Sequence, residues 1–307
     1  MCFLSAKLIY ISSTSYTGST LLSILMGSHK DIVTISELTG LIPNLKASEY
    51  KCSCEKVMTD CDFWLNIQSE FKKFSGKNLD LSDFQTHFFE GSNGFFRKLF
   101  YGSLHSNNIE RFRGFIASRF ATFNKNVNKW LLQNYNLIKA CEAVSGKKNF
   151  LDASKSPSRI PYLKKIKDHE LHIIHLVRDV RGFVNSSRKN KGQSISKAAK
   201  FWVRVHKDIE RLALYSNQPY IRIRYEDLCN NPDKIMHEIY DFLSLDHDSI
   251  RFNPSEQHLL GNRMRLRKNL DINLDEKWRT ELTKAEKALA FKISESLSIR
   301  YGYAGEN

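Results

Sequence analysis

Small hydroxyl-bearing residues follow the first apolar segment and form the stretch of the chain best suited to chemistry. Residues 12–20 lie between the apolar runs 8–11 and 21–26. A strand, a loop of small residues and a helix make a phosphate site, because loop N–H groups and the positive helix end face the anion. The residues predicted to bind a phosphate group are Ser15, Tyr16, Thr17, Gly18, Ser19 and Thr20.

This loop differs from the nucleotide-binding loop G-x-x-x-x-G-K-[ST] at two positions. Gly18 and Thr20 keep the second glycine and the final hydroxyl, but Ser13 replaces the first glycine and Ser19 replaces the lysine. Kinases and ATPases use that lysine at the β- and γ-phosphates, so its loss argues against triphosphate chemistry. A Ser/Thr-rich turn that merely caps a helix is the alternative.

A second candidate phosphate site follows the apolar run 172–177. Arg178 ends this predicted strand, and Ser186 lies about two helical turns later in the next segment. The planar guanidinium suits a phosphate, and a hydroxyl can donate to the same group. We predict that Arg178 and Ser186 bind one phosphate and that Asp179 orients Arg178.

Together, these stretches resemble the sulfotransferase superfamily, whose members use 3′-phosphoadenosine 5′-phosphosulfate (PAPS). The first is similar to the family's 5′-phosphosulfate loop, R-S-G-[ST]-[ST]-L, and the second to its 3′-phosphate segment, L-x-R-D-P-x-x-x-x-x-S. The similarity extends in order from about Lys7 to Trp278. It is closest to bacterial members and to the glycan and protein-tyrosine branch.

The resemblance implies a fold and a reaction. The fold would be an α/β, P-loop-like three-layer domain over residues 1–307, with a central parallel sheet, helices on both faces and a helical acceptor-side insert at about 65–145. The reaction would move the sulfonate group of PAPS to an acceptor hydroxyl and release 3′,5′-phosphoadenosine (PAP), without a metal.

The resemblance also implies two catalytic residues, Glu37 and Lys155. Protein-tyrosine sulfotransferases carry a catalytic Glu 21 residues after the loop Arg, and Glu37 lies 21 residues after Tyr16. A carboxylate there would accept the proton of the acceptor hydroxyl. Lys155 lies in a D-x-S-K-x-P segment like that of bacterial relatives, where an ammonium would stabilise charge on the leaving phosphate. A structural Glu, a surface Lys, and His87 or His105 as base are the alternatives.

Tyr16 is the main departure from the family pattern, because the family usually has Arg there. The missing positive charge must then come from another residue, and Lys155 is the candidate. Two other functions remain open: a small-molecule kinase that uses ATP and magnesium, and a non-catalytic polyanion-binding protein on the same fold.

Alternating arginines mark the segment 258–268, which resembles the H-x-x-x-G-N-x-x-R piece of bacterial sulfotransferases. Cytosolic relatives use a basic glycine loop here on the 3′-phosphate. The resemblance therefore makes Arg265 and Arg267 candidate cofactor-binding residues.

Cys52, Cys54 and Cys61 lie close together in the sequence. A closed zinc site normally has four ligands, and no neighbouring His supplies the fourth. We therefore predict a structural loop without a metal, and a metal site is the alternative. A disulfide would need an oxidising compartment.

Charge and composition limit the partners. The net charge of +14 favours anionic partners, including an anionic glycan, lipid, small-molecule or peptide acceptor. No nucleic-acid motif, membrane span or secretory leader is recognisable, and six cysteines without a leader suggest a reducing compartment, which predicts a cytoplasmic protein. Oligomeric state and acceptor identity are not encoded in any recognisable pattern.

Overall fold

The structure is a computed structural model of the chain. It describes residues 5–40, 46–87, 106–108, 110–112, 119, 121–247, 257–267 and 271–304. His105 and part of the predicted helical insert, including residues 88–104 and 113–118, lie outside this part.

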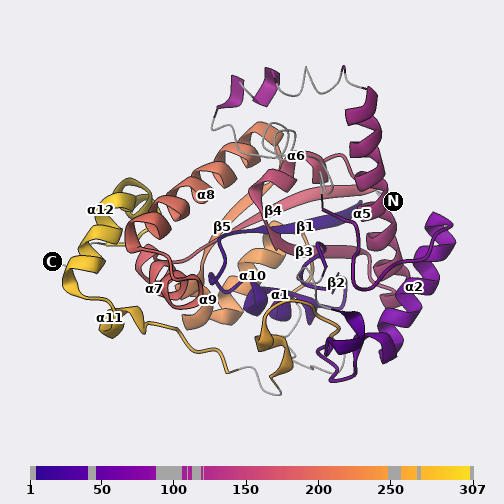
Figure 1. Cartoon of the computed structure of the whole chain (residues 1–307), viewed down its shortest axis with the longest axis horizontal. Helices are drawn as coiled ribbons and strands as arrows, with labels where there is room; N and C mark the ends of the chain where they lie inside the picture. Colours follow the sequence, from indigo (N-terminus) through magenta and orange to yellow (C-terminus); the bar gives the residue numbers. More distant parts are fainter. Residues whose placement is uncertain are drawn as a thin grey trace.

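A parallel sheet forms the centre of the molecule (Figure 1). Among the described residues it has 5 strands in the order β2-β3-β1-β4-β5, and every neighbouring pair is parallel. The strands are β1 (Ala6–Ser12), β2 (Ile32–Thr34), β3 (Asn149–Lys155), β4 (His169–Val177) and β5 (Tyr220–Arg224). The predicted α/β fold with a central parallel sheet is confirmed.

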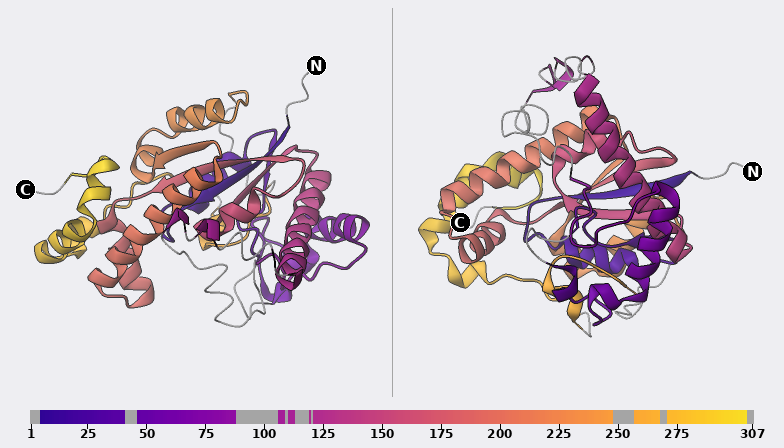
Figure 2. Two further views of the ribbon diagram at one scale, coloured as in Figure 1. Left: turned by 90° about the horizontal axis from the view of Figure 1, so that it is seen from above. Right: turned by 45° about the vertical axis from the view of Figure 1, so that its right-hand side comes forward.

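Side chains that alternate along β1 define the three layers. Leu8 and Tyr10 pack into one apolar cluster, whereas Ile9 and Ile11 pack into another, because successive residues of a strand face opposite sides. The first cluster includes α2 (Asp62–Ser75), α5 (Ala121–Ser145) and α6 (Ile160–Leu163). The second includes α1 (Ser19–Gly27), α9 (Tyr225–Asn230) and α10 (Pro232–Phe242), so helices cover both faces of the sheet (Figure 2).

A third cluster lies beyond the carboxyl end of β4. It joins α7 (Val180–Lys191) and α8 (Ile195–Ser216) to α11 (Trp278–Glu281) and α12 (Lys284–Arg300) near the C-terminus (Figure 1). Buried Trp202 at its centre donates a hydrogen bond to the carbonyl of Arg178, 3.1 Å away. This cluster therefore supports the end of the strand that carries Arg178.

β2 and β5 are short strands. β2 ends at Thr34, and Ser36 has a left-handed φ of 68°. β5 ends at Arg224, and α9 begins at Tyr225. Glu37 therefore lies in a loop beyond the sheet edge, and Tyr225 is a helix residue.

The insert is described only in part. α5 packs against β2 and β3, and α2 packs against α5, with Trp64, Phe71 and Ile138 in the shared apolar cluster. Within the described residues, no helix is long and apolar enough to cross a membrane. The assignment of the whole chain to a single domain stays a prediction.

Candidate active site

The loop after β1 depends on a glycine. Gly18 has a φ of 88° and forms the N-cap of α1. A Cβ atom at this position would lie 2.5 Å from Cδ2 of Tyr225, so a larger residue would meet both backbone strain and a collision. Gly18 thus lets the loop turn tightly into the helix, whose first N–H groups have no partner within the helix.

Thr17 maintains the shape of this loop. Its side chain is fully buried, and its hydroxyl lies 2.8 Å from the hydroxyl of Thr14. The hydroxyl predicted to bind a ligand is therefore used inside the loop.

A cavity with a volume of about 500 Å³ opens beside this loop. Its lining brings together many residues that the sequence predicted to bind the donor: Tyr16, Gly18, Ser19, Thr20, Arg178, Ser186 and Arg267. Ser15, Thr17 and Arg265 are not among its lining residues in the described part of the chain. The volume suits a nucleotide-sized ligand.

Arg178 lies at the centre of the cavity wall and is buried. It donates hydrogen bonds to the carbonyl of Tyr16 at 2.9 Å and to the Asp275 carboxylate at 3.0 Å. Its guanidinium lies over the Tyr225 ring, 4.8 Å from the centroid. The arginine is therefore held rigidly between the loop, α9 and the segment before α11.

Asp275 is the partner of Arg178, which corrects the prediction for Asp179. Asp179 instead caps α7, accepting 2.8 Å and 2.9 Å hydrogen bonds from the backbone N–H and Nε of Arg181. Burial opposes ionisation of Asp275, but the hydrogen bond from Arg178 and its charge keep the pKa of Asp275 below its usual value. The carboxylate therefore stays charged beside Arg178 at neutral pH.

The side chain of Tyr16 lies beside a lysine from another helix. Its φ is 63°, a left-handed conformation that is uncommon for a tyrosine, and Lys191 Nζ lies over its ring, 5.6 Å from the centroid. Lys191 ends α7 and is exposed. The position that is usually Arg in the family thus has a lysine from another helix beside it.

Glu37 and Lys155 meet beyond the ends of β2 and β3. Lys155 Nζ donates to Glu37 Oε1 at 2.5 Å and to the Ala153 carbonyl at 3.2 Å. Both partners are only partly exposed, Lys155 at 19% and Glu37 at 27% of the side-chain surface. The structure therefore brings the two residues predicted to be catalytic into direct contact.

The backbone is strained at Lys155 and just before Glu37. Lys155 has a φ of 69°, and Ser36, directly before Glu37, has a φ of 68°. Left-handed conformations of non-glycine residues cost of the order of 1 kcal/mol each and often occur at functional sites. The Lys155 carbonyl accepts hydrogen bonds from Ser12 Oγ at 2.8 Å and from the Ser13 N–H at 3.2 Å, so the pair adjoins the start of the loop.

Asp152 positions the Glu37 segment and was not singled out from the sequence. Its fully buried carboxylate accepts hydrogen bonds from the N–H of Leu38 at 3.1 Å and the N–H of Ser154 at 2.9 Å. Buried Arg159 pairs with its other oxygen at 3.4 Å. Asp152 is the Asp of the D-x-S-K-x-P segment, so the sequence motif could have singled it out. Its role could not be predicted, because its partner Leu38 lies more than a hundred residues earlier in the chain.

Comparison with known proteins agrees with this geometry. A profile of the family described as "Sulfotransferase family" matches residues 9–249. The chain belongs to the sulfotransferase family. A search of curated proteins found no match for this sulfotransferase.

Solved structures show the same fold. A sulfotransferase domain from the curacin biosynthetic pathway matches with a TM-score of 0.50 and 16% identity, covering 99% of each chain. Sulfotransferase STF9 from Mycobacterium avium matches with a TM-score of 0.50 and 14% identity, covering 99% of this chain and 79% of that one. At these identities the likeness establishes the fold alone.

Arg265 of this sulfotransferase does not face the cavity, which contradicts its predicted contact with the donor. Its buried guanidinium donates to the carbonyls of Gly261 at 2.7 Å and Lys51 at 2.9 Å, and it lies 4.3 Å from the centroid of the Tyr50 ring. Arg265 therefore ties two loops together. Arg267 lines the cavity as the prediction requires.

Sequence reasoning also missed the far wall of the cavity. Residues 271–277 all line the cavity, although none of them was among the predicted site residues. These residues carry both signs of charge and include Asp275 and Lys277.

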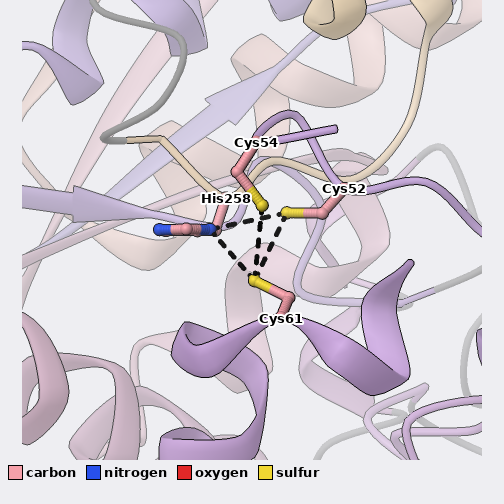
Figure 3. Close-up of side chains that lie close together, drawn as sticks. All are labelled: Cys52, Cys54, Cys61 and His258. Atoms are coloured by element: carbon pink, nitrogen blue, oxygen red, sulfur yellow. Dashed lines mark hydrogen bonds between the residues drawn. The ribbon is translucent and has the colours of Figure 1, made fainter. Parts of the chain in front are cut away.

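The three clustered cysteines of the sulfotransferase meet a distant histidine, His258 (Figure 3). Cys52 and Cys61 are buried, and Cys54 and His258 are half-buried. The sequence prediction of a loop without a metal depended on a missing fourth ligand, and the fold supplies a candidate for it.

Proposed function

We propose that this sulfotransferase moves the sulfonate group of PAPS to an acceptor hydroxyl and releases PAP. The observation that carries the proposal is the cavity, whose lining combines the start of α1 with Arg178, Ser186 and Arg267. Helix N-termini, hydroxyls and guanidinium groups are the donors that two separate phosphate groups require.

The two ends of the donor would occupy different parts of the cavity. The 5′-phosphosulfate fits the N–H groups of Gly18, Ser19 and Thr20, which begin α1. The 3′-phosphate fits Arg178 and Ser186, which line the same cavity from β4 and α7. This assignment leaves the sulfonate pointing toward the start of the loop, where the Glu37–Lys155 pair lies.

Glu37 and Lys155 have complementary roles in the proposed reaction. The acceptor oxygen attacks sulfur in line, a new S–O bond forms, and the S–O bond to the 5′-phosphate of PAP breaks. The acceptor proton passes to the Glu37 carboxylate. The Lys155 ammonium stabilises the negative charge that develops on the departing phosphate, which is the kind of electrostatic contribution that lowers barriers most.

The Lys155–Glu37 ion pair must loosen for this reaction. In the structure the ammonium contacts Glu37 directly. An arriving phosphosulfate gives Lys155 a competing anion, and transfer of the ammonium to it would free Glu37 to accept a proton. Both side chains are partly buried, so the new contact between the Lys155 ammonium and the phosphosulfate must offset the lost contact with Glu37.

Nucleotide binding tests this proposal directly. We expect PAP to raise the melting temperature of the purified protein by several degrees, because ligand at about 100 times its Kd adds roughly 2.7 kcal/mol to the unfolding free energy. AMP, which lacks the 3′-phosphate, should shift it less, and ATP with magnesium should not replace PAP.

Arg178→Ala provides the variant for this test and Arg204→Ala the control. Arg204 is an exposed arginine on α8 that does not line the described cavity. The PAP shift should disappear in the first variant and persist in the second. Stabilisation by ATP and magnesium alone would favour the kinase alternative, and no shift with any nucleotide would favour a non-catalytic binding protein.

A further inference from the structure

We propose that Cys52, Cys54, Cys61 and His258 bind one structural zinc ion (Figure 3). The site lies outside the cavity described above and does not depend on the proposed reaction. It joins the loop before α2 to the segment that leads to Arg265.

Four of the six distances among the ligand atoms are close to those of a tetrahedral zinc site, and all four atoms lie within 4.8 Å of one another. Tetrahedral coordination at ordinary Zn–S and Zn–N lengths places two sulfurs about 3.8 Å apart and a sulfur and a nitrogen about 3.5 Å apart. The Sγ atoms of Cys54 and Cys61 are 3.5 Å apart, and those of Cys61 and Cys52 are 3.9 Å apart. Nδ1 of His258 lies 3.5 Å from the Cys52 sulfur and 3.3 Å from the Cys61 sulfur.

The surroundings favour metal-ligating thiolates and a fixed imidazole. Cys61 is the N-cap residue of the 14-residue helix α2, where the positive helix end stabilises a thiolate. The His258 ring stacks on Phe63 at a centroid distance of 4.3 Å and an interplanar angle of 10°.

A disulfide explains this arrangement less well than a metal. One disulfide would join two of the sulfurs and would not explain why the third cysteine and His258 lie beside them. The Cys61 sulfur is almost equally distant from both other sulfurs and from the imidazole, so no single pair is favoured. Three sulfurs and one nitrogen in a closed tetrahedron form the ordinary ligand set of structural zinc.

Hydrogen bonds of the Ser53 side chain connect the cysteine loop to the segment that packs against the proposed base. Ser53 Oγ donates to the carbonyl of Gln257 and accepts from the N–H of Leu259 at 2.8 Å. A Cβ atom on Gly261 would lie 3.1 Å from Glu37 Oε1, so this segment packs directly against the Glu37 side chain. Zinc would therefore hold the Gly261 segment in place behind Glu37.

Metal analysis of the full chain, purified without a polyhistidine tag, tests the proposal. We expect about one zinc per chain by elemental mass spectrometry. Cys61→Ser and His258→Gln should each lose most of it. Cys141→Ala and Cys229→Ala should keep it, because these buried cysteines lie outside the cluster. Wild-type protein with less than about a tenth of an equivalent after growth in zinc, or Cys61→Ser with full occupancy, overturns the proposal.

Three measurements on the wild-type chain keep the test decisive if the variants fail to fold. Titration with a mercurial thiol reagent should release zinc in proportion to the thiols modified, and cobalt substitution should give the intense visible absorption of a tetrahedral thiolate site. A thiol count under denaturing, non-reducing conditions with chelator should find all six cysteines free. Two missing thiols together with no metal would establish a disulfide instead.

Discussion

The ammonium of Lys155 lies 2.5 Å from the carboxylate of Glu37, although 118 residues separate the two in the chain. The pair exists because β2 and β3 are parallel neighbours whose carboxyl ends lie at the same edge of the sheet. Parallel α/β sheets bind ligands at this edge. The contact keeps a proposed base and a proposed cation ready for a donor that would separate them.

Replacing either member of this pair should reduce turnover far more than donor binding. We expect Glu37→Gln to lower kcat by about 10²- to 10⁴-fold, because the amide cannot accept the acceptor proton. Lys155→Met should lower it by about 10²- to 10³-fold through lost stabilisation of the leaving phosphate. Single-turnover transfer from labelled PAPS to an acceptor found by screening measures both.

His87→Ala distinguishes the bases. If Glu37 is the base, this variant keeps wild-type turnover while Glu37→Gln does not. Normal turnover in Glu37→Gln together with a loss of turnover in His87→Ala would show that His87, not Glu37, is the base. The Kd for PAP should change less than about threefold in Glu37→Gln, since Glu37 does not line the described cavity.

Gly18→Ala should impair both folding and donor binding. Its new Cβ would lie 2.5 Å from Tyr225 Cδ2 on a backbone with φ of 88°, so Tyr225 or the loop must move. We expect a loss of about 1–3 kcal/mol in unfolding free energy and a weaker response to PAP. Thermal or urea unfolding with and without PAP measures both effects.

Gly146→Ala is the matched control, because Gly146 also has a left-handed φ, 71°, but a Cβ there would meet no atom within 4 Å. It should cost only the backbone strain, about 1 kcal/mol, and leave the PAP response intact. Equal effects of the two substitutions would show that the close approach of Tyr225 does not matter.

Asp275→Asn should strengthen PAP binding. Arg178 Nη2 donates to the backbone carbonyl of Asp275 at 2.7 Å and to its carboxylate at 3.0 Å, and the negative charge of this carboxylate faces the proposed 3′-phosphate. Removing the charge while keeping the shape should lower the Kd for PAP by about threefold to tenfold, with a smaller change for AMP. Titration calorimetry at two salt concentrations measures it. A weaker PAP complex would mean that Asp275 chiefly orients Arg178.

Local sequence patterns predicted individual elements, and the family resemblance supplied the parallel sheet. β1, α1 and β4 each have a continuous apolar pattern. Arg178 and Ser186 follow one of these strands directly, so predicting the element also placed the residues. Glu37 and Lys155 were placed by family spacing, and the fold then brought them together.

Residues positioned by distant loops could not be predicted in the same way. Arg265 and Arg267 alternate in an extended segment and look equivalent, yet packing against Tyr50 draws Arg265 away from the cavity. His258 meets the cysteines only because the fold returns residues 257–261 to the loop before α2. Sequence periodicity describes one element at a time and contains no information about contacts between residues that are far apart in the sequence.

The buried pair His175 and His206 should make the protein acid-sensitive. Nε2 of His175 lies 2.6 Å from Nδ1 of His206, and both rings are fully buried. Burial lowers the pKa of His206 to about 3, and burial together with the neighbouring ring lowers that of His175 well below its ordinary value. Both histidines are therefore neutral in the folded protein at pH 7.

The sign of the effect follows from proton binding. Between the lowered folded-state pKa values and the ordinary histidine value near 6.5, the unfolded chain binds more protons than the folded one. The unfolding free energy is therefore fully retained above about pH 6.5 and falls as the pH drops below it, by up to about 1.4 kcal/mol per pH unit for each histidine. Urea unfolding between pH 7.5 and about pH 4.5 should show this decline.

Replacing both rings isolates their contribution from that of the carboxylates. His175→Gln/His206→Gln should be less stable at pH 7.5, because the close-packed rings are lost, but its stability should decline less steeply between about pH 6.5 and 5. His247→Gln, which alters an exposed histidine, should keep the wild-type slope. If the double variant and the wild type decline in parallel, the buried histidines do not set the acid sensitivity, and groups such as the paired carboxylates must do so.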